Sequence, residues 1–142
     1  MQKRSIDHAI ELLNCEGVTL ALYDGKREII SKKRGVSPLL EFLDNGESLS
    51  TFSCADRVVG KGAAFLYVLL KAKELYTHVI SEEALKTLKK FGIPVTFHKW
   101  VPCIINRKGD GICPVESAVL NIEDPERALI AIRNRIAELS GK

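Results

Sequence analysis

The segment from Lys61 to Leu70 constrains the fold more than any other part of the chain. Apolar residues cover nearly every side of the helix predicted there: Ala63, Ala64, Phe65, Leu66, Val68, Leu69 and Leu70. A helix without a polar face is stable only when other layers of structure cover it on several sides. A strand is predicted directly before this helix, with Gly60 between them. The sequence therefore predicts an α/β protein that buries this helix, and a three-layer α/β/α sandwich does so best.

Apolar spacing predicts the remaining elements and their order. The predicted strands span residues 18–23, 26–32, 50–59, 76–80 and 94–98. The other predicted helices span 4–15, 37–43, a segment that starts at 81 and ends at Gly92, a short one from 113 and a final one from 125. Asp24-Gly25 predicts a hairpin between the first two strands, whereas the later strands alternate with helices and are expected to be parallel. The sheet is therefore expected to be a mixed sheet of five strands, followed by a long irregular stretch at 99–112.

Length and composition narrow the class of protein. A chain of 142 residues without repeats or linkers is expected to form one domain over residues 1–142. The apolar run from Gly62 to Leu70 is much shorter than the roughly 20 residues of a membrane span, and Met1–Arg4 does not lead into a signal segment. We therefore expect a soluble, cytoplasmic protein that does not contact membranes. A single Gln beside abundant Lys and Glu indicates a thermophilic source.

The distribution of charge and the spacing of the cysteines argue against a nucleic-acid-binding protein and a disulfide-linked one. The net charge is +3, and its basic residues are scattered, with Lys32-Lys33-Arg34 as the longest run. Nucleic-acid binders cluster such charge on one face, so we interpret this run as a solvated surface and do not expect a nucleic-acid partner. The four cysteines are widely spaced and form no C-x-x-C pair. We expect free thiols rather than disulfides.

The turn between the third strand and the apolar helix is the first candidate site. It reads Cys54-Ala55-Asp56-Arg57-Val58-Val59-Gly60-Lys61-Gly62-Ala63-Ala64. Such a turn places backbone N–H groups at the carboxyl edge of the sheet, where open α/β sheets bind ligands. Gly60 and Gly62 would let an anion approach the backbone, Lys61 would add a mobile positive charge, and Asp56 and Arg57 would line the same side. The alternative is a tight turn whose small residues serve close packing.

The segment Cys113-Pro114-Val115-Glu116 is the second candidate site. A helix N-terminus stabilises a thiolate, so Cys113 is a candidate reactive cysteine, and Glu116 could serve as an acid, a base or an anchor. The alternative is structural: Cys113 would be the N-cap, and Glu116 would reach back to the backbone of its own helix in a capping box. We favour the structural interpretation for Glu116.

The irregular stretch before that helix adds a third set of candidates. Cys103, Asn106 and Arg107 lie in this stretch, and the Arg107 guanidinium suits a carboxylate or a phosphate. His98 could in principle join Cys103 and Cys113 around zinc, but no closely spaced pair of ligands is present. We expect neither a metal nor another cofactor.

These two motifs, Asp56–Ala64 and Cys113–Glu116, together with the order of elements, resemble an uncharacterised prokaryotic family called domain of unknown function 1893. The resemblance covers nearly the whole chain and implies a cytidine deaminase-like fold. Active deaminases hold zinc through an H-x-E pattern and a P-C-x-x-C pattern at two helix starts. Here those places read Gly35-Val36-Ser37-Pro38 and Gly60-Lys61-Gly62-Ala63-Ala64. The resemblance therefore implies the scaffold and the pocket position without the zinc-dependent reaction.

Three functions are compatible with these residues. The leading prediction is a zinc-free cleft that binds a small anionic metabolite, such as a nucleotide or another phosphorylated molecule. The second is a thiol-dependent enzyme, acting by sulfur transfer or a covalent adduct on Cys113 or Cys103. The third is a non-catalytic binding or regulatory module, forming a homodimer through its amphipathic last helix.

Overall fold

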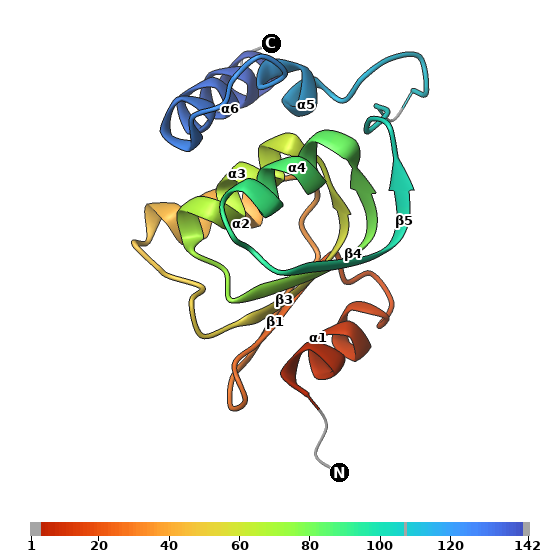
Figure 1. Ribbon diagram of the computed structural model, residues 1–142, viewed down its shortest axis with the longest axis vertical. Coiled ribbons are helices and arrows are strands. Elements are labelled where there is room, and N and C mark those ends of the chain that lie inside the picture. Colours follow the sequence, from red (N-terminus) through yellow and green to blue (C-terminus); the bar gives the residue numbers. More distant parts are fainter. Residues whose placement is uncertain (1–3, 107, 141–142) are drawn as a thin grey trace.

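One mixed sheet of five strands, in the order β2-β1-β3-β4-β5, organises the protein (Figure 1). The computed structural model describes residues 4–106 and 108–140. The strands are β1 (Leu20–Tyr23), β2 (Glu28–Ser31), β3 (Ser53–Val59), β4 (Glu74–Ser81) and β5 (Val95–Val101). β1 is antiparallel to both β2 and β3, whereas β3, β4 and β5 are parallel to one another. The predicted mixed five-strand sheet is therefore confirmed.

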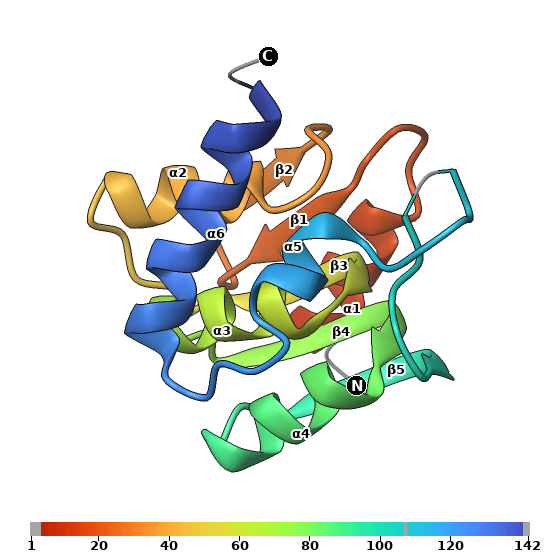
Figure 2. The same cartoon turned by 90° about the horizontal axis from the view of Figure 1, so that it is seen from above.

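Helices cover both faces of this sheet (Figures 1 and 2). They are α1 (Ser5–Leu13), α2 (Ser37–Asp44), α3 (Lys61–Leu70), α4 (Glu82–Lys90), α5 (Pro114–Ala118) and α6 (Pro125–Ser140). α1 packs alone on one face, and α2, α3 and α4 lie on the other, with α5 and α6 forming a further layer above α3. This explains the composition of α3, since Ala64, Phe65 and Leu66 are completely buried. The predicted burial of the central helix is confirmed.

Two hydrophobic cores result, one on each side of the sheet. The larger lies between the sheet and α3, and includes Leu22, Phe65 and Ile80. The smaller lies under α1 and is formed by Ala9, Leu13, Val18, Ala21 and Ala55.

No helix in the described part of the chain is long and apolar enough to cross a membrane.

Capping residues set the helix boundaries, mostly as the sequence indicates. The Ser81 hydroxyl accepts a hydrogen bond from the Ala84 N–H at 3.1 Å and starts α4, and the Asp124 carboxylate accepts one from the Arg127 N–H at 2.9 Å and starts α6. The prediction for α2 is wrong in detail. Val36 occupies the N-cap position, and Ser37 is already helical and makes no side-chain cap.

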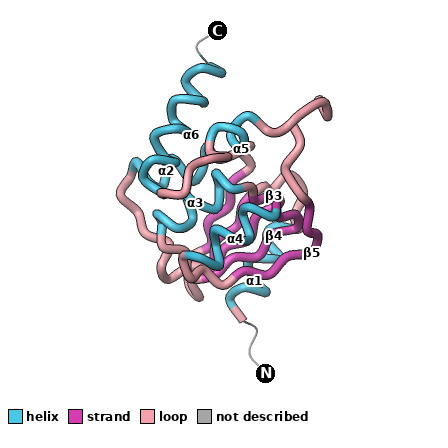
Figure 3. Tube along the Cα trace, turned by 45° about the horizontal axis from the view of Figure 1, so that its top comes forward, coloured by secondary structure: helices cyan, strands magenta, loops and turns pink. Residues whose placement is uncertain are grey.

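The stretch at 99–112 is more ordered than expected. β5 continues to Val101 rather than ending at 98, and Ile105 pairs with Ile112 to close a small hairpin. The prediction of an irregular connection is therefore wrong at both of these places. Figure 3 shows the connection leaving β5 and returning to α5 beside the carboxyl ends of the parallel strands. This return positions α5 against the start of α3.

Candidate functional site

A cavity of about 980 Å³ lies at the carboxyl end of β3, and we refer to it as the strand-end cavity. Its walls come from the start of β1, the end of β3, the starts of α2, α3 and α5, the connection between β5 and α5, and the end of α6. The lining residues are Thr19, Leu20, Arg34, Gly35, Val36, Pro38, Leu39, Asp56, Arg57, Val58, Gly60, Gly62, Ala63, Ile104, Ile105, Asn106, Lys108, Asp110, Cys113, Pro114, Val115, Glu116 and Leu139. Both motifs singled out in the sequence therefore contribute to one cavity.

The two motifs also touch each other directly. The Glu116 carboxylate is buried and accepts a hydrogen bond from the backbone N–H of Lys61, the first residue of α3. An N–H at this position has no partner within its own helix, and the positive end of the helix dipole favours a negative charge. Glu116 thus caps a different helix from its own. The predicted capping box within its own helix is wrong.

The two glycines of the first motif make this contact sterically feasible. A Cβ added at Gly60 would overlap the Glu116 carboxylate, and one added at Gly62 would lie 2.7 Å from Val115 Cγ1. Real Cβ atoms essentially never approach so closely. The glycines therefore serve the close approach of α5 to α3, as the packing interpretation of this turn stated.

Lys61 does not present a mobile charge to the cavity. Its side chain is 2% exposed, and its Nζ donates a hydrogen bond to the Leu120 carbonyl at 2.9 Å and lies 3.5 Å from the Glu123 carboxylate. These contacts hold the chain between α5 and α6 against α3. The prediction that Lys61 supplies a mobile cation for a ligand is therefore wrong, because the ammonium is buried and already partnered.

Asp56 provides a titratable group in the cavity. Its carboxylate accepts hydrogen bonds from the Tyr67 hydroxyl at 2.6 Å and from the Arg57 N–H at 2.8 Å. Burial raises the pKa of Asp56 to about 6, against the lowering effect of these hydrogen bonds. A carboxyl group that titrates near neutral pH in a cleft can donate or accept a proton, which is a common property of functional sites. Burial also raises the pKa of Tyr67.

Arg57 lines the cavity, but its guanidinium binds backbone carbonyl groups beside α1, on the other side of the sheet. It donates hydrogen bonds to the Leu13 carbonyl, at 2.8 Å, and to the Val18 carbonyl. The Leu13 carbonyl ends α1, where carbonyl groups have no partner within the helix. Arg57 therefore anchors α1 to β3, with its Nε and Nη2 groups directed to these carbonyls.

The connection between β5 and α5 forms the outer wall of the cavity. The Asn106 side chain accepts hydrogen bonds from the N–H groups of Gly109 and Asp110 and donates one to the Asp110 carboxylate at 2.9 Å. Asn106 lines the cavity, but its side chain is engaged in shaping this turn. Arg107, the predicted carboxylate or phosphate ligand, lies outside the described residues.

The two candidate cysteines differ in position. Cys113 is half-buried and lines the cavity at the start of α5, where its N–H donates to the Ile104 carbonyl at 2.9 Å. Cys103 is also half-buried but does not line the cavity. No three His, Cys, Asp or Glu side chains among the described residues form a group that could hold a metal ion.

The sequence interpretation missed several cavity residues, of which Arg34 and Lys108 are the most informative. Both side chains are exposed, and within residues 4–106 and 108–140 neither has a hydrogen-bond or ion-pair partner. Arg34 belongs to the Lys32–Arg34 run that we interpreted as a solvated surface. Its place three residues before α2, in a predicted strand-to-helix connection, is the signal in the sequence.

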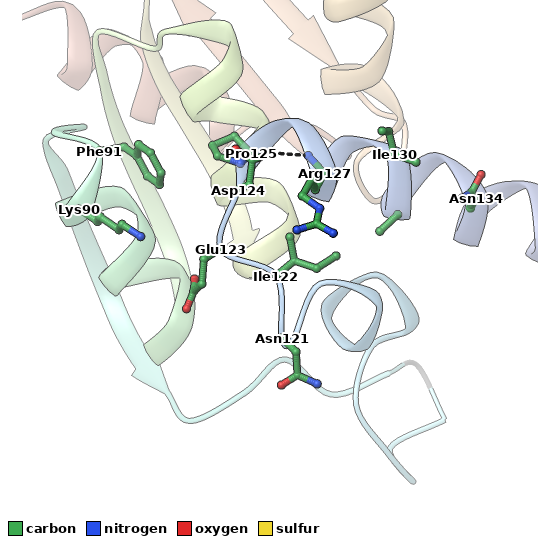
Figure 4. A pocket seen from close by; sticks show the side chains of 11 residues that line it. Lys90, Phe91, Asn121, Ile122, Glu123, Asp124, Pro125, Arg127, Ile130 and Asn134 are labelled. Atoms are coloured by element: carbon green, nitrogen blue, oxygen red, sulfur yellow. Dashed lines mark hydrogen bonds between the residues drawn. The ribbon is translucent and has the colours of Figure 1, made fainter.

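A second cavity of about 850 Å³ lies between the end of α4 and the start of α6, and we refer to it as the α4–α6 cavity (Figure 4). Its labelled residues include Phe91, Ile122, Arg127 and Ile130. Neither sequence motif contributes to it. The strand-end cavity is therefore the candidate functional site.

Comparison with known proteins places the chain in a family. The family model described as Domain of unknown function (DUF1893) matches residues 8–136. A solved structure of a DUF1893 family protein from Thermotoga maritima is 28% identical, with a TM-score of 0.84, and the match covers 97% of this chain and 92% of that chain. No curated protein matches, and the cytidine deaminase-like label stays a prediction. By both its sequence and its fold, the chain belongs to the DUF1893 family.

Proposed function

We propose that the strand-end cavity binds a small anionic metabolite, such as a nucleotide, with its charged group at the rim and its less polar part inside. The observation that carries this proposal is the combination of a largely apolar interior with two cations, Arg34 and Lys108, that have no partner among residues 4–106 and 108–140. Ligand pockets typically combine apolar walls with a few polar groups that fix orientation.

The interior suits a weakly polar group. Its apolar side chains come from both sides of the cavity: Leu20, Val36, Leu39, Val58, Ala63, Ile104, Ile105, Val115 and Leu139. A volume of about 980 Å³ lies at the upper end of the range of small-molecule sites. Asp56 supplies a polar contact in this interior, whereas the hydroxyl of Thr19, which also lines the cavity, donates to the Ser31 and Lys33 carbonyls.

The charges of the lining residues favour an anion at the rim. The Arg57 guanidinium donates to two carbonyl groups at the α1 side of the sheet, and the Glu116 carboxylate accepts from the start of α3. Asp110 accepts a hydrogen bond from Asn106. Among the described residues of the cavity, Arg34 and Lys108 are thus the cations whose side chains have no hydrogen-bond or ion-pair partner.

The same contacts argue against an anion at the first turn of α3, the position that the sequence indicated. An anion was expected at the first turn of α3, but the Glu116 carboxylate already accepts the Lys61 N–H there. A phosphate at that turn would meet a like charge. We therefore assign the ligand's anionic group to Arg34 and Lys108.

Calorimetry with nucleoside monophosphates, the matching nucleosides and inorganic phosphate tests the proposal. We expect a monophosphate to bind, and the double variant Arg34→Ala/Lys108→Ala to bind it at least about tenfold more weakly, since a charge-assisted hydrogen bond contributes more than a neutral one. Lys73→Ala is the matched control, because Lys73 is exposed at the opposite end of the strands, just before β4. The absence of binding by any monophosphate would contradict the nucleotide assignment, and equal binding by the double variant would contradict the rim assignment.

A second candidate function is thiol chemistry at Cys113, favoured by the place of this residue in the cavity wall. If Cys113 is a nucleophile, iodoacetamide should alkylate it faster than Cys15, which is more exposed. Peptide mass spectrometry over a time course measures both rates in one sample. A slower reaction at Cys113 than at Cys15 would count against this function and leave the binding proposal unaffected.

A further inference from the structure

We propose that β5 is an interaction surface for a second copy of this chain, and that two β5 strands pair antiparallel about a twofold axis at His98. The pairing would join the sheets of two copies edge to edge. This proposal is independent of the function assigned to the strand-end cavity.

The first observation is the exposure of the strand. β5 ends the sheet, and its five central residues, Thr96 to Trp100, are all exposed. The opposite edge, β2, has four residues, whereas β5 has seven. Native proteins usually shorten, cover or charge their edge strands, because an open edge is a template for pairing with another chain. Lys99 is the one acidic or basic residue other than histidine within β5.

The second observation is that no other strand in the described structure pairs with the outer edge of β5, although α4 packs against the strand on one face of the sheet. α1, on one face of the sheet, packs against β1, β3 and β4 and makes no comparable contact with β5 (Figure 1). Within residues 4–106 and 108–140, the backbone of β5 has hydrogen-bonded strand pairing to β4 alone. The outer N–H and C=O groups of the strand are therefore available to another strand.

The third observation is the kind of side chain that is exposed. Trp100 is the one tryptophan of the chain and is 45% exposed, and Phe97 is 40% exposed. Aromatic side chains are enriched in protein interfaces and supply much of their binding energy. Two such residues on one open strand indicate a protein partner rather than a small ligand.

The sequence around β5 favours a second copy as that partner. Pro94 and Pro102 flank the strand, and each lies four residues from His98. Proline lacks an N–H group and ends a ladder of hydrogen bonds. An antiparallel pair centred on His98 therefore uses the full strand in both copies and places the prolines opposite each other at its ends.

The charges are compatible with this register. A centre at His98 sets Phe97 opposite Lys99 of the other copy, and Thr96 opposite Trp100. The cation thus lies across from an aromatic ring, an arrangement that stabilises strand pairs. A centre at Lys99 would instead set two like charges opposite each other, which is unfavourable.

The last helix is a weaker candidate for the dimer interface. Its most exposed large apolar side chains are Ile130 and Leu139. Ile130 lines the α4–α6 cavity (Figure 4), and Leu139 lines the strand-end cavity. These side chains therefore contribute to concave sites rather than to a continuous apolar face.

Sedimentation velocity over a wide range of protein concentration tests the proposal on the full chain. We expect a dimer for the wild type, and His98→Lys to weaken it by about tenfold or more, because two lysines would face each other at the axis. Thr51→Lys adds the same charge at an exposed turn outside β5 and should leave the dimer intact. Ile130→Lys tests the last helix and should also leave it intact. A wild-type monomer at every concentration, or a dimer that His98→Lys does not weaken, would overturn the proposal.

Disulfide cross-linking provides a second readout that does not depend on His98→Lys folding normally. Directly opposite residues of an antiparallel pair lie about 4.5–5.5 Å apart, within the range that a disulfide bridges. In a background of Cys15→Ser, Cys103→Ser and Cys113→Ser, we expect His98→Cys to form a covalent dimer under mild oxidation and Thr51→Cys not to do so. Equal cross-linking of the two variants would overturn the proposed register.

Discussion

The Glu116 carboxylate, on α5, accepts a hydrogen bond from the backbone N–H of Lys61, the first residue of α3. The two residues are 55 positions apart in the chain. Their contact brings the two sequence motifs together and places a negative charge at the start of α3. It also determines where the strand-end cavity can accept an anion, because this helix terminus is already occupied.

Removing the Glu116 carboxylate should destabilise the fold. Glu116→Ala leaves the buried Lys61 N–H without a partner, so we expect a loss of about 1–3 kcal/mol in the free energy of unfolding. Glu116→Gln keeps an acceptor but loses the charge, and should lose less, about 0.3–1 kcal/mol. Urea denaturation measures both values. An unchanged free energy of unfolding in Glu116→Ala would show that the hydrogen bond to Lys61 does not matter.

The close approach of α5 to α3 predicts a strong coupling between Gly62 and Val115. Gly62→Ala should destabilise the protein, because the new methyl group would lie 2.7 Å from Val115 Cγ1. In a Val115→Ala background that atom is absent, and alanine's higher helix propensity should then stabilise α3 by about 0.5–1 kcal/mol. A double-mutant cycle on unfolding free energies measures the coupling. An identical effect of Gly62→Ala in both backgrounds would refute the contact.

The raised pKa of Asp56 predicts a specific pH dependence of stability. A pKa of about 6 in the folded protein, against the ordinary value of 3.8, means that the folded state binds this proton more tightly than the unfolded state. Between pH 3.8 and about pH 6, the free energy of unfolding of the wild type should therefore fall, relative to that of Asp56→Asn, as the pH rises. Above about pH 6 the difference between the two proteins should become constant. Urea denaturation of both proteins across this range measures it.

A matched variant tests the cause of that dependence. The Tyr67 hydroxyl donates to the Asp56 carboxylate and lowers its pKa. Tyr67→Phe should therefore raise the pKa of Asp56 further, as read from the side-chain carbon in an NMR titration. A pKa that falls in this variant would contradict the assignment.

The buried Lys61 ammonium should matter for stability and not for ligand binding. Lys61→Met keeps most of the aliphatic chain but loses the hydrogen bond to the Leu120 carbonyl, so we expect a loss of about 1–3 kcal/mol in unfolding free energy. Monophosphate affinity should stay unchanged at a temperature where the variant is folded. Arg34→Ala should show the opposite pattern, with weaker binding and unchanged stability. A large loss of affinity in Lys61→Met would place its charge in the binding site after all.

Much of the fold could be predicted because its signals are local. The Asp24-Gly25 turn, the Ser81 and Asp124 caps and the apolar surface of α3 each depend on a few neighbouring residues. The extension of β5 to Val101 and the bridge between Ile105 and Ile112 were missed. Both depend on pairing between segments, which a residue pattern does not encode at short range.

The candidate site was predictable in position but not in the roles of its charges. Helix starts at the carboxyl ends of parallel strands indicated where Gly60 and Cys113 would meet. Whether Lys61 points into the cavity or away from it depends on the Leu120 carbonyl, 59 residues along the chain. Likewise, Arg57 is occupied by carbonyl groups near α1, and Arg34 became visible as a cavity residue only through the folded geometry.

The most direct test of the proposed site is an NMR titration of the ¹⁵N-labelled protein with a nucleoside monophosphate that binds in calorimetry. The account predicts that amide shifts concentrate at the walls of the strand-end cavity, at Thr19, Gly35, Val58, Gly60 and Cys113, and that the effects at Gly35 weaken in Arg34→Ala. Shifts that concentrate instead around Phe91 and Ile130 in the α4–α6 cavity, or that spread evenly over the surface, would contradict it.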